Sequence, residues 1–171
     1  MILTDVQDAK RLEQTAGIRA GLAAKLARWT ADGTETSTPI PGLMMYQLSA
    51  PNVPIPILYE PSLAVIVQGK KRVVVGGEVF FYDESRYLLT SVDLPALAQV
   101  IETPYLCTTL KLDLPLIRGL IADFDLQLPD NIPPSRGMVT APTTLELFAA
   151  FSRLVDLLDT PHDIPALAGL I

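Results

Sequence analysis

The chain has 171 residues, of which 49% are apolar, and this suffices for one domain with a hydrophobic core. That apolar share excludes a disordered chain, and a formal net charge of −6 disfavours direct binding to a nucleic-acid backbone. The single cysteine, Cys107, excludes an intrachain disulfide, and its apolar surroundings indicate a buried strand residue rather than a nucleophile.

The first third of the chain combines one helix with a proline-rich stretch. Apolar residues recur at roughly helical spacing over residues 4–30, with Thr4 or Asp5 as the N-terminal cap and Gly33 as the stop. Residues 30–39 are polar and are expected to form a linker. Prolines then crowd residues 39–61, which predicts edge strands and extended loops, with residues 42–49 as the one plausible strand.

Residues 62–112 are expected to be entirely β. Short β-branched or aromatic runs alternate with turn signals at a spacing typical of a barrel or sandwich. Gly69-Lys70 and Gly76-Gly77 suit two-residue turns, which predicts a meander of strands 63–68, 71–75 and 78–82. The second turn pairs Val75 with Glu78, Val74 with Val79, Val73 with Phe80, Arg72 with Phe81 and Lys71 with Tyr82. Both faces are apolar near the turn, which fits a sheet covered on both sides or closed around a cavity.

The pattern becomes helical after residue 112. Asp113 is expected to cap one helix with Pro115 in its first turn, and Thr143-x-x-Glu146 predicts the capping box of another. A last helix is expected within residues 162–171, and a chain that ends there is expected to be a piece of a longer protein.

The helix after the capping box carries an apolar stripe at helical spacing. Such a stripe either packs on the chain's own sheet or is shared with a partner, and we expect a partial share in a dimer. Its residues are Leu147, Phe148, Phe151, Leu154, Val155 and Leu158.

Several kinds of chemistry lack support. The order of glycines and lysines in residues 69–77 does not match a phosphate-binding loop, and there is no G-x-S-x-G nucleophile elbow. One histidine, His162, cannot build a centre of several histidines, so no metal or cofactor is expected and His162 is interpreted as an exposed turn residue. A pair of carboxylates stays open, from Glu60, Glu78, Asp83, Glu84 and Asp93.

No stretch approaches the roughly 20 apolar residues of a membrane helix. Charged residues interrupt any apolar run near the N-terminus, so no signal peptide is expected and the default location is the cytoplasm.

All five tyrosines lie in the β region or in the proline-rich approach to it: Tyr46, Tyr59, Tyr82, Tyr87 and Tyr105. An apolar ring with a polar tip suits a ligand pocket. The alternative is that these rings pack at the edges of the sheet with their hydroxyls in water.

The stretch LYEPSLAVIVQGKKRVVVGGEVFFYDESRYLLTSVDLP, residues 58–95, resembles the N-terminal domain of AraC-type transcriptional regulators. The resemblance is carried by YEPS, QGKK, YD, YLL and SVDLP, continues through PYLCTTLKLDL, and covers about residues 40–171. It implies an α+β, mainly β fold, with a cupin-like double-stranded β-barrel at residues 37–112. An N-terminal helix and linker would occupy residues 1–36, and a helical segment residues 113–171.

The resemblance also implies a function. The barrel would sense a small molecule, the helices after it would form a homodimer, and a C-terminal domain outside this chain would bind DNA. We expect no enzymatic activity and no membrane partner, and we expect the tyrosines and Gln99 to hold an effector of unknown identity. Two alternatives remain: a metal-free cupin enzyme of the isomerase or lyase type, and a dimerisation module that binds no ligand.

Departures from the family pattern concern turns and metal ligands. Residues 101–104 form a shorter connection than is usual, and Ser85 stands where the family usually has a glycine. The histidines that hold metal in cupin enzymes are absent before Leu63. Ligand contacts from these turns are therefore the least transferable part of the resemblance.

Overall fold

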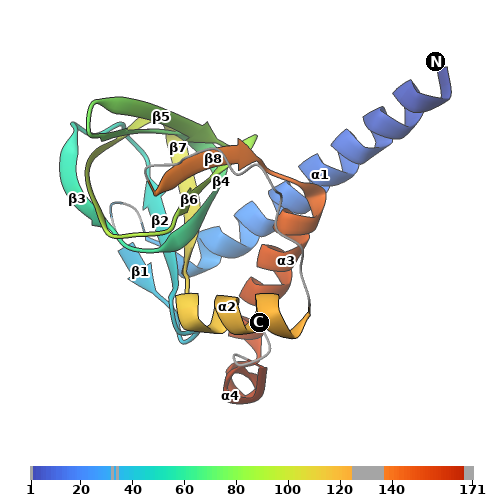
Figure 1. Ribbon diagram of the computed structural model, residues 1–171. Coiled ribbons are helices and arrows are strands. Elements are labelled where there is room, and N and C mark those ends of the chain that lie inside the picture. The colour runs from blue at the N-terminus through green and yellow to red at the C-terminus, as the bar shows by residue number, and fades with distance from the viewer. Residues whose placement is uncertain (1, 32, 34, 125–136, 168–171) are drawn as a thin grey trace.

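The computed structural model describes residues 2–31, 33, 35–124 and 137–167, with side chains from residue 10 onward. An antiparallel sheet is flanked by helices on one side (Figure 1). Its strands are β1 (Glu35–Ser37), β2 (Leu43–Leu48), β3 (Ile55–Tyr59), β4 (Ser62–Val75), β5 (Glu78–Asp83), β6 (Arg86–Thr90), β7 (Leu94–Lys111) and β8 (Met138–Pro142). The helices are α1 (Ile2–Trp29), α2 (Leu114–Asp123), α3 (Leu145–Asp156) and α4 (Ile164–Leu167), with short 3-10 turns at Leu157–Asp159 and Pro161–Asp163.

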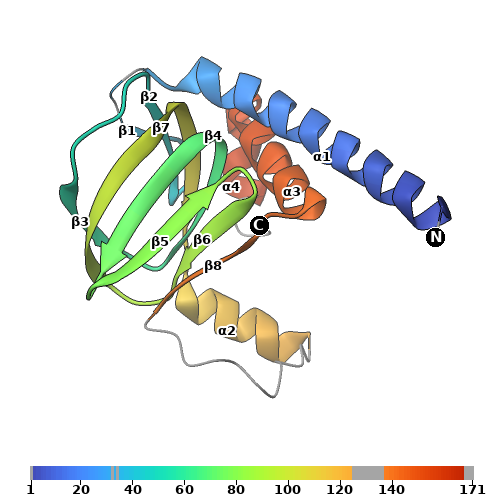
Figure 2. The same cartoon turned by 90° about the horizontal axis from the view of Figure 1, so that it is seen from above.

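The sheet bends because its two longest strands change partners along their length. The strand order is β1-β2-β7-β4-β5-β6-β8, and β3 pairs with β7 as well. The first half of β7 pairs with β3 and its second half with β2, while β4 pairs with β6 at its start and with β5 at its end. The two halves of the sheet therefore face each other, as Figure 2 shows from above. Buried side chains such as Val73, Tyr82 and Val100 lie in the space between them.

The hairpin at Gly76-Gly77 confirms the predicted register. Both glycines have positive φ, and all five predicted pairs between β4 and β5 are present. Of the two alternatives for these apolar faces, a sheet covered on both sides is wrong at this hairpin, because Val79 and Phe81 are 45% and 47% exposed on its outer face. Only the face with Val73 and Tyr82 is buried.

The predicted turn at Gly69-Lys70 is wrong. β4 continues through it as a bulge, with register shifts against β7 on both sides of Gly69. Gly69 has a φ of +81°, and a Cβ there would lie 2.5 Å from the Glu102 carbonyl oxygen. The glycine thus permits close approach of two strands rather than a reversal of the chain. The connection expected at residues 101–104 is likewise not a break in the sheet, because these residues lie within one continuous strand, β7.

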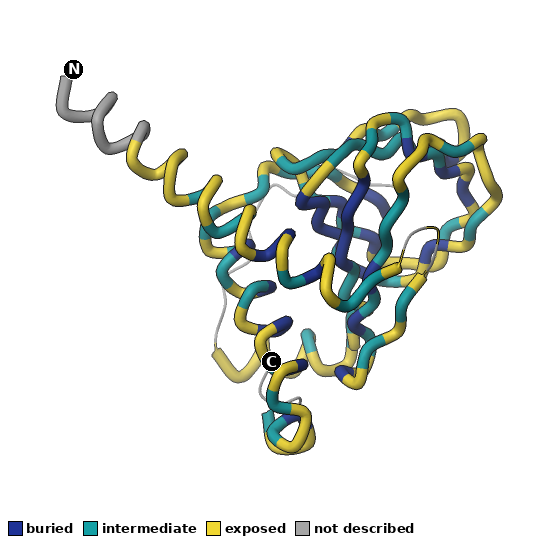
Figure 3. Tube along the Cα trace, turned by 180° about the vertical axis from the view of Figure 1, so that it is seen from behind, coloured by how far each residue is buried: buried dark blue, intermediate teal, exposed yellow. Residues whose placement is uncertain are grey.

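The helices α1 and α3 cover the outer face of the strands β2, β4 and β7. Leu22 and Leu26 of α1 are fully buried against that face, which shows that the N-terminal helix packs on its own chain. The N-terminal part of α1 projects beyond the sheet (Figures 1 and 3). Its residues from Lys10 to Gln14 are therefore exposed.

The apolar stripe of α3 belongs to this core. Phe148, Phe151, Leu154, Val155 and Leu158 are at most 5% exposed and contact α1 and the sheet side chains of the same cluster. The chain itself covers these five residues, and the expected partial share with a partner stays a prediction. Leu147 is the one member that stays partly exposed.

The predicted helix caps are correct for α2, but the observed cap of α3 and the start of α1 differ from the predicted positions. Asp113 caps α2 as expected, since its carboxylate accepts a hydrogen bond from the Leu116 amide at 2.9 Å. α3 is capped by Thr144 rather than Thr143, and Thr144 Oγ1 accepts from the Leu147 amide at 3.2 Å. α1 begins at Ile2, so the helix already includes the residues expected to cap it.

Two strands lie where none was expected: β1 occupies part of the predicted linker, and β8 pairs with β6. β3 includes Pro56 and pairs with β7 alone, in line with the edge strands predicted for residues 39–61. The described part of the last helix is α4, and residues 168–171 lie outside the described residues. Among the helices that the structure describes, none has the length and hydropathy needed to cross a membrane.

Candidate functional site

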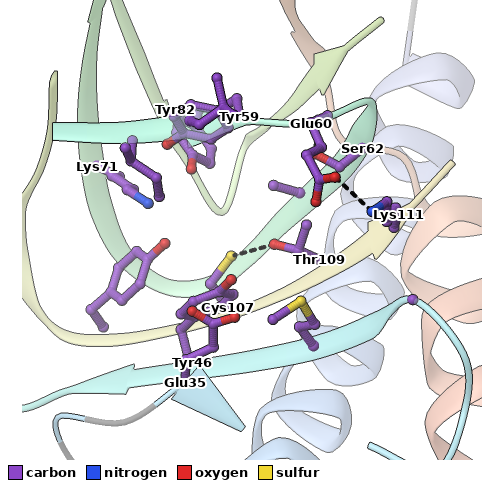
Figure 4. A pocket seen from close by; sticks show the side chains of 16 residues that line it. Glu35, Tyr46, Tyr59, Glu60, Ser62, Lys71, Tyr82, Cys107, Thr109 and Lys111 are labelled. Atoms are coloured by element: carbon purple, nitrogen blue, oxygen red, sulfur yellow. Dashed lines mark hydrogen bonds and ion pairs between the residues drawn. The ribbon is translucent and has the colours of Figure 1, made fainter. Parts of the chain in front are cut away.

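A cavity of about 230 Å³ lies between the two halves of the sheet (Figure 4). Strands from both halves supply its walls. Tyr46 comes from β2, Tyr59 from β3, Tyr82 from β5, and Tyr105 and Cys107 from β7. Because side chains alternate along a strand, each of these positions faces inward while its neighbours face the helices or solvent.

A second hollow of about 290 Å³ adjoins the first. Both are lined by Glu35, Tyr46, Ile57, Lys71 and Tyr105. The second continues between β3 and the start of β7, where Ile55, Ala98 and Val100 line it. The interior therefore has two lobes that meet at these shared residues.

The structure brings four of the six predicted ligand residues to this cavity. Tyr46, Tyr59, Tyr82 and Tyr105 all line it. Tyr87 packs instead against the core under α1 and α3, because the next residue on β6 is the one that faces inward. Gln99 lies on β7 between two inward-facing residues, and its amide donates to the Asn52 carbonyl oxygen at 3.1 Å.

Burial favours the neutral form of three tyrosines of the cavity, Tyr46, Tyr82 and Tyr105. It raises the pKa of Tyr82 and of Tyr105 well above the ordinary value, and neighbouring ionisable groups raise them further. Burial also raises the pKa of Tyr46, followed by the negative charge of Glu35. Neutral hydroxyls can both donate and accept hydrogen bonds, so these rings offer apolar walls with polar tips.

The hydroxyl of Tyr59 is buried beside that of Tyr82, but it makes no hydrogen bond of ordinary length and angle among the described residues. A buried hydroxyl without a partner costs about 1–3 kcal/mol. A bound molecule or water in the cavity would offer the missing partner.

Lys71 is the site residue that the sequence analysis missed. It pairs with Tyr82 on β5 and with Val100 on β7, and both of these are inward-facing, so Lys71 faces inward as well. Its ammonium lies 5.6 Å from the centre of the Tyr59 ring. The predicted pairing of Lys71 with Tyr82 already carried this signal, because residues directly opposite in an antiparallel pair share a face.

The carboxylates near the cavity do not converge. Glu60 is 2.7 Å from the ammonium of Lys111, and Glu35 lies beside Tyr46 at another part of the wall (Figure 4). The other carboxylates of the open sequence hypothesis do not line the cavity; they are Glu78, Asp83, Glu84 and Asp93.

Neither Cys107 nor His162 supports catalysis. Cys107 is 2% exposed and burial raises the pKa of its thiol, which confirms the buried strand residue expected from the sequence. His162 is exposed, as expected, and lies 3.3 Å from Asp163. Within the described ranges, no group of three or more histidine, cysteine or acidic residues could hold a metal ion.

A family model described as the N-terminus of AraC-type transcriptional regulators matches residues 39–171. A search of curated protein sequences finds no match to this chain.

Solved structures of ToxT from Vibrio cholerae are similar in part. An apo variant of ToxT has 11% sequence identity and a TM-score of 0.49, over 75% of this chain and 53% of that one. ToxT bound to (E)-4-(8-methylnaphthalen-1-yl)but-3-enoic acid has 13% identity and a TM-score of 0.48, over 66% and 46%. Wild-type ToxT bound to an unsaturated fatty acid has 10% identity and a TM-score of 0.45, over 74% and 50%. This chain thus spans about half the length of these structures.

Proposed function

The chain belongs to the family of AraC-type transcriptional regulator N-termini, and from this premise we propose that it binds a small-molecule effector between the two halves of its sheet. The family makes it a regulatory domain of a transcription regulator. We describe the bent sheet as cupin-like, since β4 and β7 each serve both halves and enclose a hollow, although the paired strand order runs open from β1 to β8.

One observation carries the proposal: four tyrosines and a lysine from different strands converge on one cavity. Such a cavity gains nothing for folding, because a void forfeits the packing contacts of its walls. A ligand would restore these contacts and give the Tyr59 hydroxyl a partner. At about 230 Å³, the cavity has room for a small organic molecule, which weighs against a module that binds no ligand.

Binding rather than catalysis is the better account of this site. An isomerase or lyase that works with carboxylates would need two of them at one point of the cavity. Glu60 is instead held by Lys111, and Glu35 lies elsewhere on the wall (Figure 4). We therefore propose an effector site without metal, cofactor or catalytic group.

Regulation would act through a DNA-binding domain outside this chain and through a homodimer. An effector would change the spacing of β4 and β7, on which α1 and α3 rest, and a coupling of about 1–3 kcal/mol is enough for a regulatory response.

The dimer needs a surface other than the buried stripe of α3. We propose the face of α2 that carries Leu116, Leu120 and Phe124, which are 46%, 40% and 69% exposed and recur every four residues.

The test of effector binding is thermal unfolding of this chain against a panel of small metabolites, beside the cavity-filling variant Ala64→Phe. Ala64 lines the cavity and is 4% exposed, so a larger side chain there takes up ligand space. A ligand at 100 times its Kd should stabilise the original chain by about 2.7 kcal/mol and the variant by much less. Equal stabilisation of both would place binding elsewhere and contradict the proposal.

The dimer is tested separately by sedimentation of the chain and of Leu120→Glu. The substitution should shift the equilibrium to monomer without loss of helix or sheet signal, because α2 has no buried residues. An unchanged dimer, or a chain that is monomeric from the start, would refute α2 as the interface.

A further inference from the structure

Two lysines line the cavity, Lys71 and Lys111, and the position of Lys71 follows from the strand register. Lys71 lies between Tyr82 and Val100 on the inner face, and these two residues are at most 2% exposed. An ammonium held on the inner face of a sheet loses part of its hydration, and this is unfavourable unless another group interacts with the charge. The question is therefore which group does so.

The other lysines of β4 and β7 already have carboxylates. Lys70, next to Lys71 but on the opposite face, lies 3.9 Å from Asp83 and 3.8 Å from Glu102. Lys111 lies 2.7 Å from Glu60. Lys71 has no carboxylate within ion-pair distance among the residues that the structure describes. Its ammonium instead lies over the ring of Tyr59.

The acidic residues of the cavity do not fill this role. Glu60 is neutralised by Lys111 at one part of the wall. Glu35 is an exposed residue of β1 at the rim, and its charge acts on the Tyr46 hydroxyl. Figure 4 shows Lys71 directed into the space between these groups.

A second group beside Lys71 also lacks a partner. The Tyr59 hydroxyl is buried without a hydrogen bond among the described residues, and the Tyr59 ring lies 5.6 Å from the Lys71 ammonium. A carboxylate accepts hydrogen bonds from both an ammonium and a hydroxyl, and such charge-assisted bonds are short and strong. One anionic group could therefore interact with both residues at once.

The volume limits the rest of the ligand. An apolar cavity of about 150 Å³ holds one benzene ring, and the lobe that both Tyr59 and Lys71 line is about 230 Å³. The remaining space suits a short acidic side chain, and the tyrosine rings suit stacking on an aromatic body.

From these observations we propose that the effector is a compact aromatic carboxylate, with its carboxylate on Lys71 and Tyr59 and its ring among the tyrosines of the cavity. This inference rests on the proposed effector site and adds the charge and size class of the ligand. Lys71 is then a specificity residue, because it selects anions from neutral molecules of the same shape.

The experiment compares three matched series by isothermal titration calorimetry at pH 7. Benzoate, phenylacetate and 3-phenylpropionate are the acids, their primary amides are the neutral series, and benzylamine and 2-phenylethylamine are the cations. The best acid should bind roughly 10- to 100-fold more tightly than its amide, as expected for a hydrogen bond to a charged group. Equal binding of acid and amide, or a preference for an amine, would overturn the inference.

Substitutions test whether the Lys71 ammonium causes the preference for acids over amides. Lys71→Met should abolish the preference for acid over amide, Lys71→Arg should retain it, and Tyr59→Phe should weaken acid binding with less effect on the amide. Lys70→Met is the matched control, since Lys70 is the adjacent lysine on the outer face and should leave the preference intact. A preference that survives in Lys71→Met would refute the assignment, and the acid–amide comparison in the unaltered chain stands even if that variant unfolds.

The failure of this inference differs from the failure of the proposed function. If amides bind and Ala64→Phe blocks them, an effector cavity exists and only its anion selectivity is wrong. If none of the three series binds, the inference is wrong, and the effector cavity is judged by the metabolite panel with the same Ala64→Phe control.

Discussion

The bulge at Gly69 gives the sharpest prediction about the fold. Gly69→Ala would place a Cβ 2.5 Å from the Glu102 carbonyl oxygen and 2.7 Å from the Pro104 carbonyl oxygen. Both atoms belong to the backbone of β7, so neither can move aside as a flexible side chain would. The residue would also keep a φ of +81°, which L-residues with a side chain rarely adopt. The strands β4 and β7 must therefore separate locally.

The control for this substitution is Gly77→Ala in the same region of the sheet. Gly77 has a φ of +86°, but a Cβ there meets no atom within 4 Å. It should lose about 1–2 kcal/mol for the left-handed backbone alone. Gly69→Ala should lose a further 1–3 kcal/mol or so for the displaced strands.

Urea unfolding followed by circular dichroism measures both effects. The midpoint should fall further for Gly69→Ala than for Gly77→Ala, with similar slopes, because the same surface is exposed on unfolding. If the two variants agree within roughly 0.5 kcal/mol, the close approach of β4 and β7 at the bulge does not exist in solution.

Other substitutions test the core, a helix cap and a carboxylate. Phe151→Glu should prevent folding rather than give a soluble monomer, because Phe151 is 3% exposed inside the chain's own core; a folded monomer seen by sedimentation and circular dichroism would show instead an interface. Thr144→Ala should lower the free energy of unfolding by about 1 kcal/mol, while Thr143→Ala should have less effect, since only the Thr144 hydroxyl oxygen accepts a hydrogen bond from an amide of α3; equal losses in urea titrations would contradict the cap. Burial favours protonation of Asp83, but hydrogen bonds from the hydroxyl and amide of Ser85 and the charge of Lys70 prevail and lower its pKa. Its stabilising effect is then present above the ordinary carboxyl pKa and is lost as the pH falls through the lowered value, so Asp83→Asn should flatten the acid limb of a stability–pH profile, and an unchanged limb would exclude this carboxylate as a contributor.

Local signals in the sequence were sufficient for one part of the sheet. The Gly76-Gly77 turn fixed a register that the structure reproduces pair by pair, because a two-residue hairpin with positive φ leaves one alignment. Gly69 carried the same local signal but has a different cause, the approach of β7, which lies more than 30 residues away in sequence. Only the spatial arrangement distinguishes these two uses of glycine.

The candidate site shows a similar limit. Tyr87 and Gln99 were predicted as ligand residues by type and region, yet each lies one position away from the inward-facing residues of its strand. Since both faces of these strands are apolar, the sequence does not reveal which set of alternating residues faces the cavity. The α3 stripe likewise predicts burial but not the surface that covers it, and α1 supplied that surface.

The strands β4 and β7 separate the cavity from the helices by a single layer of backbone. Ala64 and Ile66 of β4 face the cavity, while Val65 and Val67, the residues next to them, contact the core beneath α1 and α3. Side chains on the two faces of a sheet extend from the same backbone. A ligand that shifts β4 and β7 would therefore also shift the surface on which α1 and α3 pack. A regulator built in this way needs no relay of side chains, and its response should depend on the stiffness of β4 more than on the identity of any residue between ligand and helix.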